Sequence, residues 1–229
     1  MQISPKQQRD RVLQMMIVWF VLGAAILLAL TYAGPETGED YITDTGLVQM
    51  TTLMTLVIAA ISAAALAVRH AGNRVNLALL ACGLTIYAGR EHDLHRLEFL
   101  PEHYTRWQFY VMPDVTIWQK LAFGAMMLLI ITVISTFVVR MAKPALRDLK
   151  RAEPWAILGM AWFTTLVASQ ISDRTWLNDT FAGRAFEEVA EFVAGGIALL
   201  VVLYFPRIAT TEEAAATEMT PQPAQANAA

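Results

Sequence analysis

The sequence predicts an all-α polytopic membrane protein, a single bundle of about six transmembrane helices. Of its 229 residues, 56% are hydrophobic and 16% are charged, whereas soluble domains carry about a quarter charged residues. The apolar residues gather in long runs, and a helix needs roughly 20 of them to cross a hydrocarbon core about 30 Å thick. No strand-like alternation of apolar and polar residues competes with these runs.

Six apolar runs are each expected to form one membrane-crossing helix. The first is longer than the roughly 7 to 15 apolar residues of a secretory signal, so it is expected to be retained. The runs cover residues 13–33, 47–68, 75–95, 115–141, 155–172 and 183–206.

Residues typical of helix starts precede three of the runs. Asp44 or Thr45 suits the N-cap of the second run, Asp114 that of the fourth, and Pro154 the first turn of the fifth. The second run also contains small residues, which let helix backbones approach closely in lipid, so they predict a packing face. These small residues are Ala59, Ala60, Ser62, Ala63, Ala64 and Ala65.

The loops predict the orientation, because Lys and Arg accumulate on the cytoplasmic side of membrane proteins. Loop 34–46 has no Lys or Arg and four acidic residues, so it belongs outside. Both termini are therefore expected to be cytoplasmic, in the plasma or inner membrane of a prokaryote. The basic residues assigned to the inside are Lys6, Arg9, Arg11, Arg69, Arg74, Arg140, Lys143, Arg147, Lys150 and Arg151.

Two segments lie outside the predicted spans. Residues 1–207 are expected to form the membrane domain, and 208–229, rich in Ala, Thr, Pro and Gln, a disordered cytoplasmic tail. Residues 97–113 contain several aromatic rings, which favour the headgroup region, so they are expected to lie on the outer interface as an anchor or a lid. The net charge of -3 and the lack of a basic arm make membrane lipids, and not nucleic acid, the expected partners.

The third and sixth runs are too short to cross a membrane on apolar residues alone. Only 15 residues, 75–89, precede the charged stretch 90–95, and only 15, 192–206, follow Glu191. The charged residues must therefore complete both helices at their outer ends. Ionisable groups at membrane depth usually face the bundle interior and pair there, so these groups are expected to converge.

Helical spacing indicates which acidic residues share a face. Glu91 and His95 are four residues apart, as are Glu187 and Glu191, and Glu188 is three residues from Glu191. Like-charged carboxylates on one face repel each other strongly in a medium of low dielectric constant. A proton, a Lys or Arg side chain, or a metal ion must offset that repulsion.

Each of these three ways to offset the repulsion between the carboxylates corresponds to a different hypothesis. A structural ion-pair network would use Arg90, Lys120, Arg174 and Arg184. A metal site would use zinc, iron or manganese, which suit imidazole and carboxylate ligands. A proton or cation relay would use the carboxyl groups themselves. The predicted metal ligands are Glu91, His95, Glu188 and Glu191.

The functional prediction is a metal-dependent membrane hydrolase that acts on a lipid-like substrate from the outer side. Asp93 or Glu187 would be the general base, and Arg90 or Arg174 would stabilise developing negative charge. The alternatives are a proton- or cation-coupled transporter and a non-catalytic subunit. No His-Glu-x-x-His motif, nucleophile elbow or Gly-rich phosphate loop is present.

Two serines lie near the predicted site. Ser169 and Ser172 stand close to the end of the fifth run. A serine inside a helix commonly bonds its own backbone. Both hydroxyl groups are therefore expected to bond the backbone of their own helix and to have no role in the site.

Overall fold

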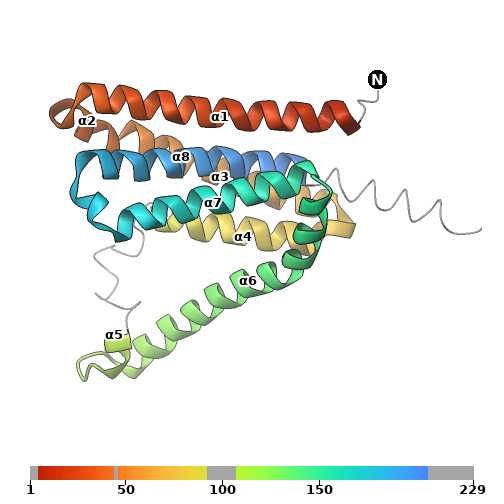
Figure 1. Ribbon diagram of the computed structural model, residues 1–229. Helices are drawn as coiled ribbons and strands as arrows, with labels where there is room; N and C mark the ends of the chain where they lie inside the picture. The colour runs from red at the N-terminus through yellow and green to blue at the C-terminus, as the bar shows by residue number, and fades with distance from the viewer. Residues whose placement is uncertain (1–4, 44–45, 92–106, 206–229) are drawn as a thin grey trace, which may run out of the picture.

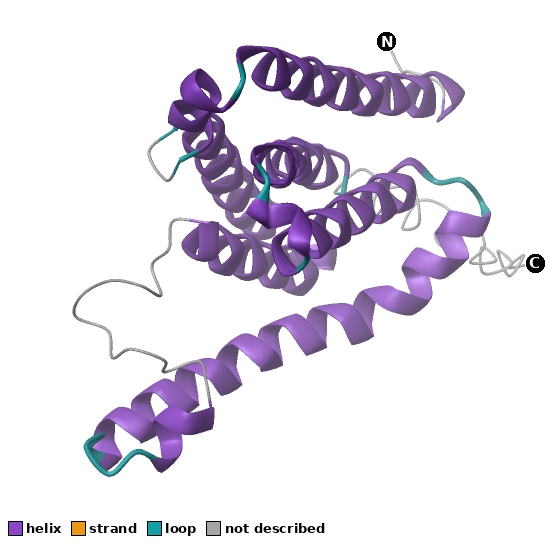
Figure 2. Ribbon diagram, turned by 60° about the vertical axis from the view of Figure 1, so that its left-hand side comes forward, coloured by secondary structure: helices purple, strands orange, loops and turns teal. Residues whose placement is uncertain are grey.

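The computed structural model describes residues 5–43, 46–91 and 107–205, and these are helical with no strand, which confirms the all-α prediction. Most of the helices run side by side along one direction (Figures 1 and 2). The helices are α1 Pro5–Ala33, α2 Pro35–Ile42, α3 Leu47–Arg69, α4 Arg74–Glu91, α5 Trp107–Val111, α6 Ile117–Lys150, α7 Pro154–Arg174 and α8 Phe181–Tyr204. The predicted tail 208–229 lies outside the described residues.

Four helical stretches among the described residues are long and apolar enough to cross a membrane. This supports the prediction of a polytopic membrane protein. α4 and α8, which contain the two runs predicted to be short of apolar residues, are not among the four. The four stretches are Arg9–Ala33, Pro35–Arg69, Ile117–Lys150 and Pro154–Arg174.

α8 is the central helix of the bundle and contacts α1, α3 and α7 (Figure 1). Almost every residue between Val189 and Val202 is buried. A helix that is apolar all round its circumference is typical of the middle of a bundle. Glu191 is consequently enclosed by protein, and only 4% of its surface is exposed.

Small residues form the contact faces of α3 and α8. Ala59, Ala60 and Ala63 are buried in the core, as predicted, whereas Ala64 and Ala65 are exposed. On α8, Gly196 lies directly against the ring of Trp19 on α1. Close approach through small residues is the usual way in which helices associate within lipid.

α6 stands apart from the other helices along much of its length (Figures 1 and 2). None of the residues in its most apolar stretch is buried. The predicted N-cap Asp114 is wrong, because Thr116 and Gln119 form a reciprocal capping box and the helix begins at Ile117. The helix also continues through Pro144 to Lys150, beyond the predicted end at Met141.

The ends of the other predicted elements differ in detail. Loop 34–46 contains the short helix α2, which begins at Pro35 after Gly34, whose φ is positive at 75°. Pro154 stands in the first turn of α7, as predicted. Residues 107–111 of the aromatic segment form α5, and its buried Phe109 packs edge-on against Phe123 of α6. The predicted N-cap at Asp44 or Thr45 is wrong, because α3 begins at Leu47 and its N-cap is Gly46. Residues 97–106 lie outside the described residues.

Gly196→Ala is expected to lower the Tm in detergent. An added Cβ would overlap the Trp19 ring, so α1 would have to move away from α8, and overpacking of this kind costs about 1–3 kcal/mol. Gly83→Ala is the matched control, because nothing lies within 4 Å of its added Cβ. Equal Tm values for the two variants would contradict the close approach of α1 and α8.

Candidate functional site

The candidate site lies where the end of α4, the beginning of α8 and the end of α7 meet, on the left of Figure 1. We call Glu91, Glu188 and Glu191 the carboxyl cluster. Glu91 is the last residue of α4, and the other two stand in the second and third turns of α8. Two helices far apart in the sequence thus bring acidic side chains to one end of the bundle.

Glu91 and Glu191 lie within hydrogen-bonding reach of each other. Both are buried, with 7% and 4% of their surface exposed. Carboxylates are acceptors only, so a hydrogen bond between two carboxyl groups requires a proton on one of them. The structure therefore brings these two predicted ligands together in a place where both cannot be charged without compensation.

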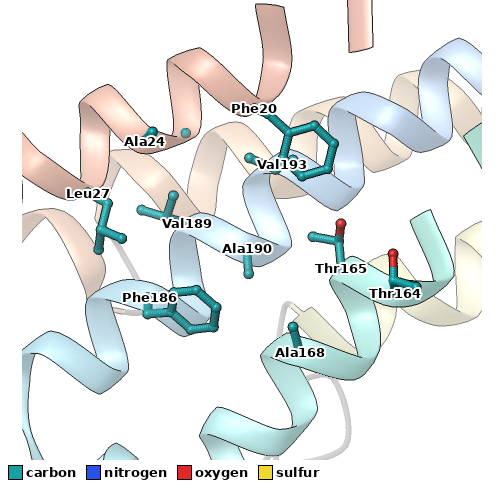
Figure 3. A pocket seen from close by; sticks show the side chains of 11 residues that line it. Phe20, Ala24, Leu27, Thr164, Thr165, Ala168, Phe186, Val189, Ala190 and Val193 are labelled. Carbon is teal, nitrogen blue, oxygen red and sulfur yellow. The ribbon is translucent and has the colours of Figure 1, made fainter. Parts of the chain in front are cut away.

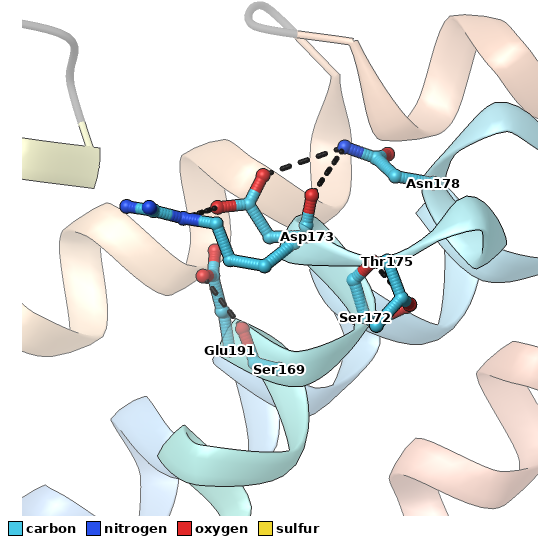
Figure 4. A network of polar contacts seen from close by, with 7 residues as sticks. Ser169, Ser172, Asp173, Thr175, Asn178 and Glu191 are labelled. Atoms are coloured by element: carbon cyan, nitrogen blue, oxygen red, sulfur yellow. Dashed lines mark hydrogen bonds and ion pairs between the residues drawn. The ribbon is translucent and has the colours of Figure 1, made fainter.

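Ser169 joins α7 to this pair. Its hydroxyl is fully buried and donates to Oε1 of Glu191 at 2.8 Å (Figure 4). Ser172, one turn further on, donates to the backbone oxygen of Gly183 at 3.0 Å. The expectation that both serines bond their own backbone is therefore wrong, because each hydroxyl crosses to α8.

The spacing of the polar residues along α7 indicates that they contact a neighbouring helix. Thr165, Ser169 and Ser172 stand at positions i, i+4 and i+7, which form one helix face, and all three are buried. A polar stripe on the buried face of a membrane helix indicates contact with a neighbouring helix.

Further polar groups surround the carboxyl cluster. Gln49 of α3 donates to the backbone oxygen of Glu91 at 3.1 Å. The hydroxyl of Tyr87, close to Glu91 and Glu191, is buried without a hydrogen-bond partner in the described part of the chain. Unpaired buried polar groups are costly, so this end of the bundle is suited to a polar ligand.

Most of the cations predicted for an ion-pair network lie elsewhere. Arg184 pairs with Glu39 of α2. Arg174 is 81% exposed and pairs with Asp173 at 3.5 Å, while Lys120 donates to the backbone oxygen of Met112 at 2.8 Å. No ion pair seen among the described residues joins a Lys or Arg to Glu91 or Glu191. Of the basic residues in the described part of the chain, Arg90, exposed at the end of α4, acts on Glu91 electrostatically.

The remaining predicted site residues divide into two groups. Glu187 and Glu188 are partly buried on α8. Asp93 and His95 lie outside the described residues, so their predicted roles stay predictions. Within the described ranges, no three His, Cys, Asp or Glu side chains form a group suited to a metal ion.

An apolar groove of about 340 Å³ runs between α1, α7 and α8 (Figure 3). Its lining includes Phe20 and Leu27 of α1 and Phe186 of α8. Ala168 and Ala190, also in the lining, directly precede Ser169 and Glu191 in the sequence. The groove therefore shares α8 with the carboxyl cluster, and its other wall includes α7, which carries Ser169.

No family model, curated protein or solved structure matches the chain. Helical bundles serve many unrelated functions, so function has to be inferred from the site. The carboxyl cluster and the groove beside it are the features from which we infer it.

Ser169→Ala is expected to destabilise the protein, because it removes a hydroxyl that donates to the buried carboxylate of Glu191. Loss of one partner of a buried polar group costs about 1–3 kcal/mol. Thr132→Ala is the control, since that exposed hydroxyl bonds the backbone oxygen of Leu128 within its own helix. A Tm for Ser169→Ala that equals the control value would contradict a structural role for the bond.

Proposed function

We propose that the chain is a membrane-embedded enzyme that binds a divalent metal ion at the carboxyl cluster and hydrolyses a lipid-like substrate. The observation that supports this most is the contact between buried Glu91 and Glu191. No ion pair in the described part of the chain brings a Lys or Arg to either of them. Their mutual repulsion at low dielectric constant has to be balanced by a bound cation or a proton.

The donor set suits zinc, iron or manganese. Helical bundles hold such metals with inward-facing Glu and His side chains from several helices. The proposed ligands are Glu91, Glu188 and Glu191, with His95 added on the basis of its spacing from Glu91 in the sequence. A divalent ion held there would make water a stronger nucleophile at neutral pH.

The surrounding residues have separate proposed roles. Ser169 orients the Glu191 carboxylate through its hydrogen bond. Glu187, one turn before Glu191 and partly buried, or Asp93 serves as the general base. Arg90 stabilises developing negative charge; Arg174 was expected to share this role, but it is exposed and paired with Asp173.

The groove supports a lipid-like substrate. Its walls are mostly apolar side chains, and one of them is formed by α8, the helix that carries Glu188 and Glu191. An acyl chain in the groove would keep the polar end of the same molecule near Glu191. Binding energy from such a remote apolar part of a substrate helps to orient the reacting group.

A proton- or cation-coupled transporter is the second candidate, since the contact between Glu91 and Glu191 requires a shared proton or a cation. A transport path needs polar groups across the whole membrane. From Phe192 to Leu203, however, α8 has no polar side chain. On α4, Thr85 bonds its own backbone. A site open at one end of the bundle fits these features better.

We further propose that α4 and α8 complete six membrane crossings, with both termini in the cytoplasm of a prokaryote. Basic residues lie at the Lys150 end of the bundle, and the carboxyl cluster lies at the opposite end (Figure 1). The positive-inside rule then places the cluster toward the outer leaflet.

Single-cysteine labelling in a Cys82→Ala background tests this topology. A cysteine replacing Arg151 is expected to react only from the cytoplasmic side, and one replacing exposed Glu36 only from outside. The reverse pattern would place the carboxyl cluster on the cytoplasmic side. Labelling of both positions from one side would overturn the six-span arrangement.

Elemental analysis of the protein purified in detergent tests the metal site. We expect about one zinc, iron or manganese ion per chain, and loss of most of it in Glu191→Gln and His95→Ala. Glu36→Gln, which removes an exposed carboxylate far from the cluster in sequence, is the control and should retain the metal. Absence of metal after incubation with each ion would exclude the hydrolase mechanism and favour the transporter or a structural role.

A further inference from the structure

The C-terminal part of α6 differs from the rest of that helix. α6 has 34 residues, which correspond to about 51 Å, well beyond a hydrocarbon core of about 30 Å. Toward its C-terminal end, where Pro144 stands, the helix turns and crosses the end of the bundle (Figure 1). Proline inside a helix is a common cause of such a bend.

One face of this last part packs on the bundle. Met141, Ala145 and Leu149, at i, i+4 and i+8, contact a small core that contains Trp155 and Phe205. Asp148 lies on the same side and is buried, with 4% of its surface exposed. The segment is therefore held in a fixed orientation.

The opposite face of this segment carries basic side chains around a depression, which we call the basic hollow. Ala142 and Leu146 line a depression of about 610 Å³ together with four basic side chains. Asp148 is the only acidic residue between positions 140 and 151, and Arg147 already pairs with it at 2.6 Å. The four basic residues are Lys143, Arg147, Lys150 and Arg151.

We propose that this basic hollow binds the phosphate headgroup of an anionic membrane lipid. It follows directly on the apolar stretch of α6, so it stands at headgroup depth. Lys and Arg are the usual donors to phosphate, and basic clusters next to a membrane span attract anionic lipids. Leu146, 59% exposed in the same hollow, offers contact to the lipid's apolar part. This site is at the other end of the bundle from the carboxyl cluster and does not depend on its function.

Native mass spectrometry of the whole protein, with phosphatidylglycerol or phosphatidylcholine of identical acyl chains, tests the proposal. The wild type is expected to bind phosphatidylglycerol at least about tenfold more tightly. Lys143→Gln/Lys150→Gln/Arg151→Gln should lose most of that preference. Arg147 is left in place, because its removal would leave the buried Asp148 carboxylate unpaired.

The control is Arg11→Gln/Arg69→Gln/Arg74→Gln, which removes the same charge from exposed positions outside the hollow. It should keep the preference for phosphatidylglycerol. Equal loss in both variants, or no loss in the first, would overturn the proposal. Displacement of the lipid by an excess of inorganic phosphate would overturn it too, by showing a site for free anions. Equal Tm values for the variants exclude unfolding as the cause.

Discussion

The need to bury a carboxyl group in the central helix constrains the rest of the bundle. Glu191 stands in a stretch of α8 that is otherwise apolar and is surrounded by α1, α3 and α7. A buried carboxyl group is tolerated only where hydrogen bonds or opposite charge replace water. Ser169 and Glu91 provide these contacts from two different helices, so α4 and α7 must meet α8 at this level.

The remaining contacts of α8 are made by small or apolar side chains, which need no hydrogen bond or opposite charge from the neighbouring helices. Gly196 admits the Trp19 ring of α1, and Ala59 and Ala63 let α3 approach. In lipid, apolar side chains gain nothing from leaving the solvent, so packing depends on close fit and on polar contacts. This is consistent with the position of α6, which has no buried residue in its most apolar stretch and stands apart from the other helices along much of its length.

The sequence was sufficient to predict the helical fold, the approximate positions of the apolar helices, the alanine face of α3, and the meeting of Glu91 with a glutamate of α8. Each depends on helical period or on apolar length, which a single sequence contains. The directions of Ser169 and Ser172 could not be predicted in the same way. A hydroxyl group can bond a partner on the next helix in place of its own backbone only when that helix is near. The sequence alone does not give that distance.

The bonding partners of the Lys and Arg side chains could not be predicted from the sequence for a similar reason. Arg184 stands only three residues before Glu187, yet it pairs with Glu39, which becomes its neighbour because the loop after α1 folds into α2. Lys120 was assigned to the site from its depth in the fourth run, but α6 diverges from the bundle and leaves it beside Met112. Depth in a membrane can be read from apolar length, whereas contact between two helices also depends on their tilt and on their rotation about their axes. Among the described residues, no ion pair consequently joins a Lys or Arg to Glu91 or Glu191, and this is the physical basis for proposing a bound proton or metal ion between these two carboxyl groups.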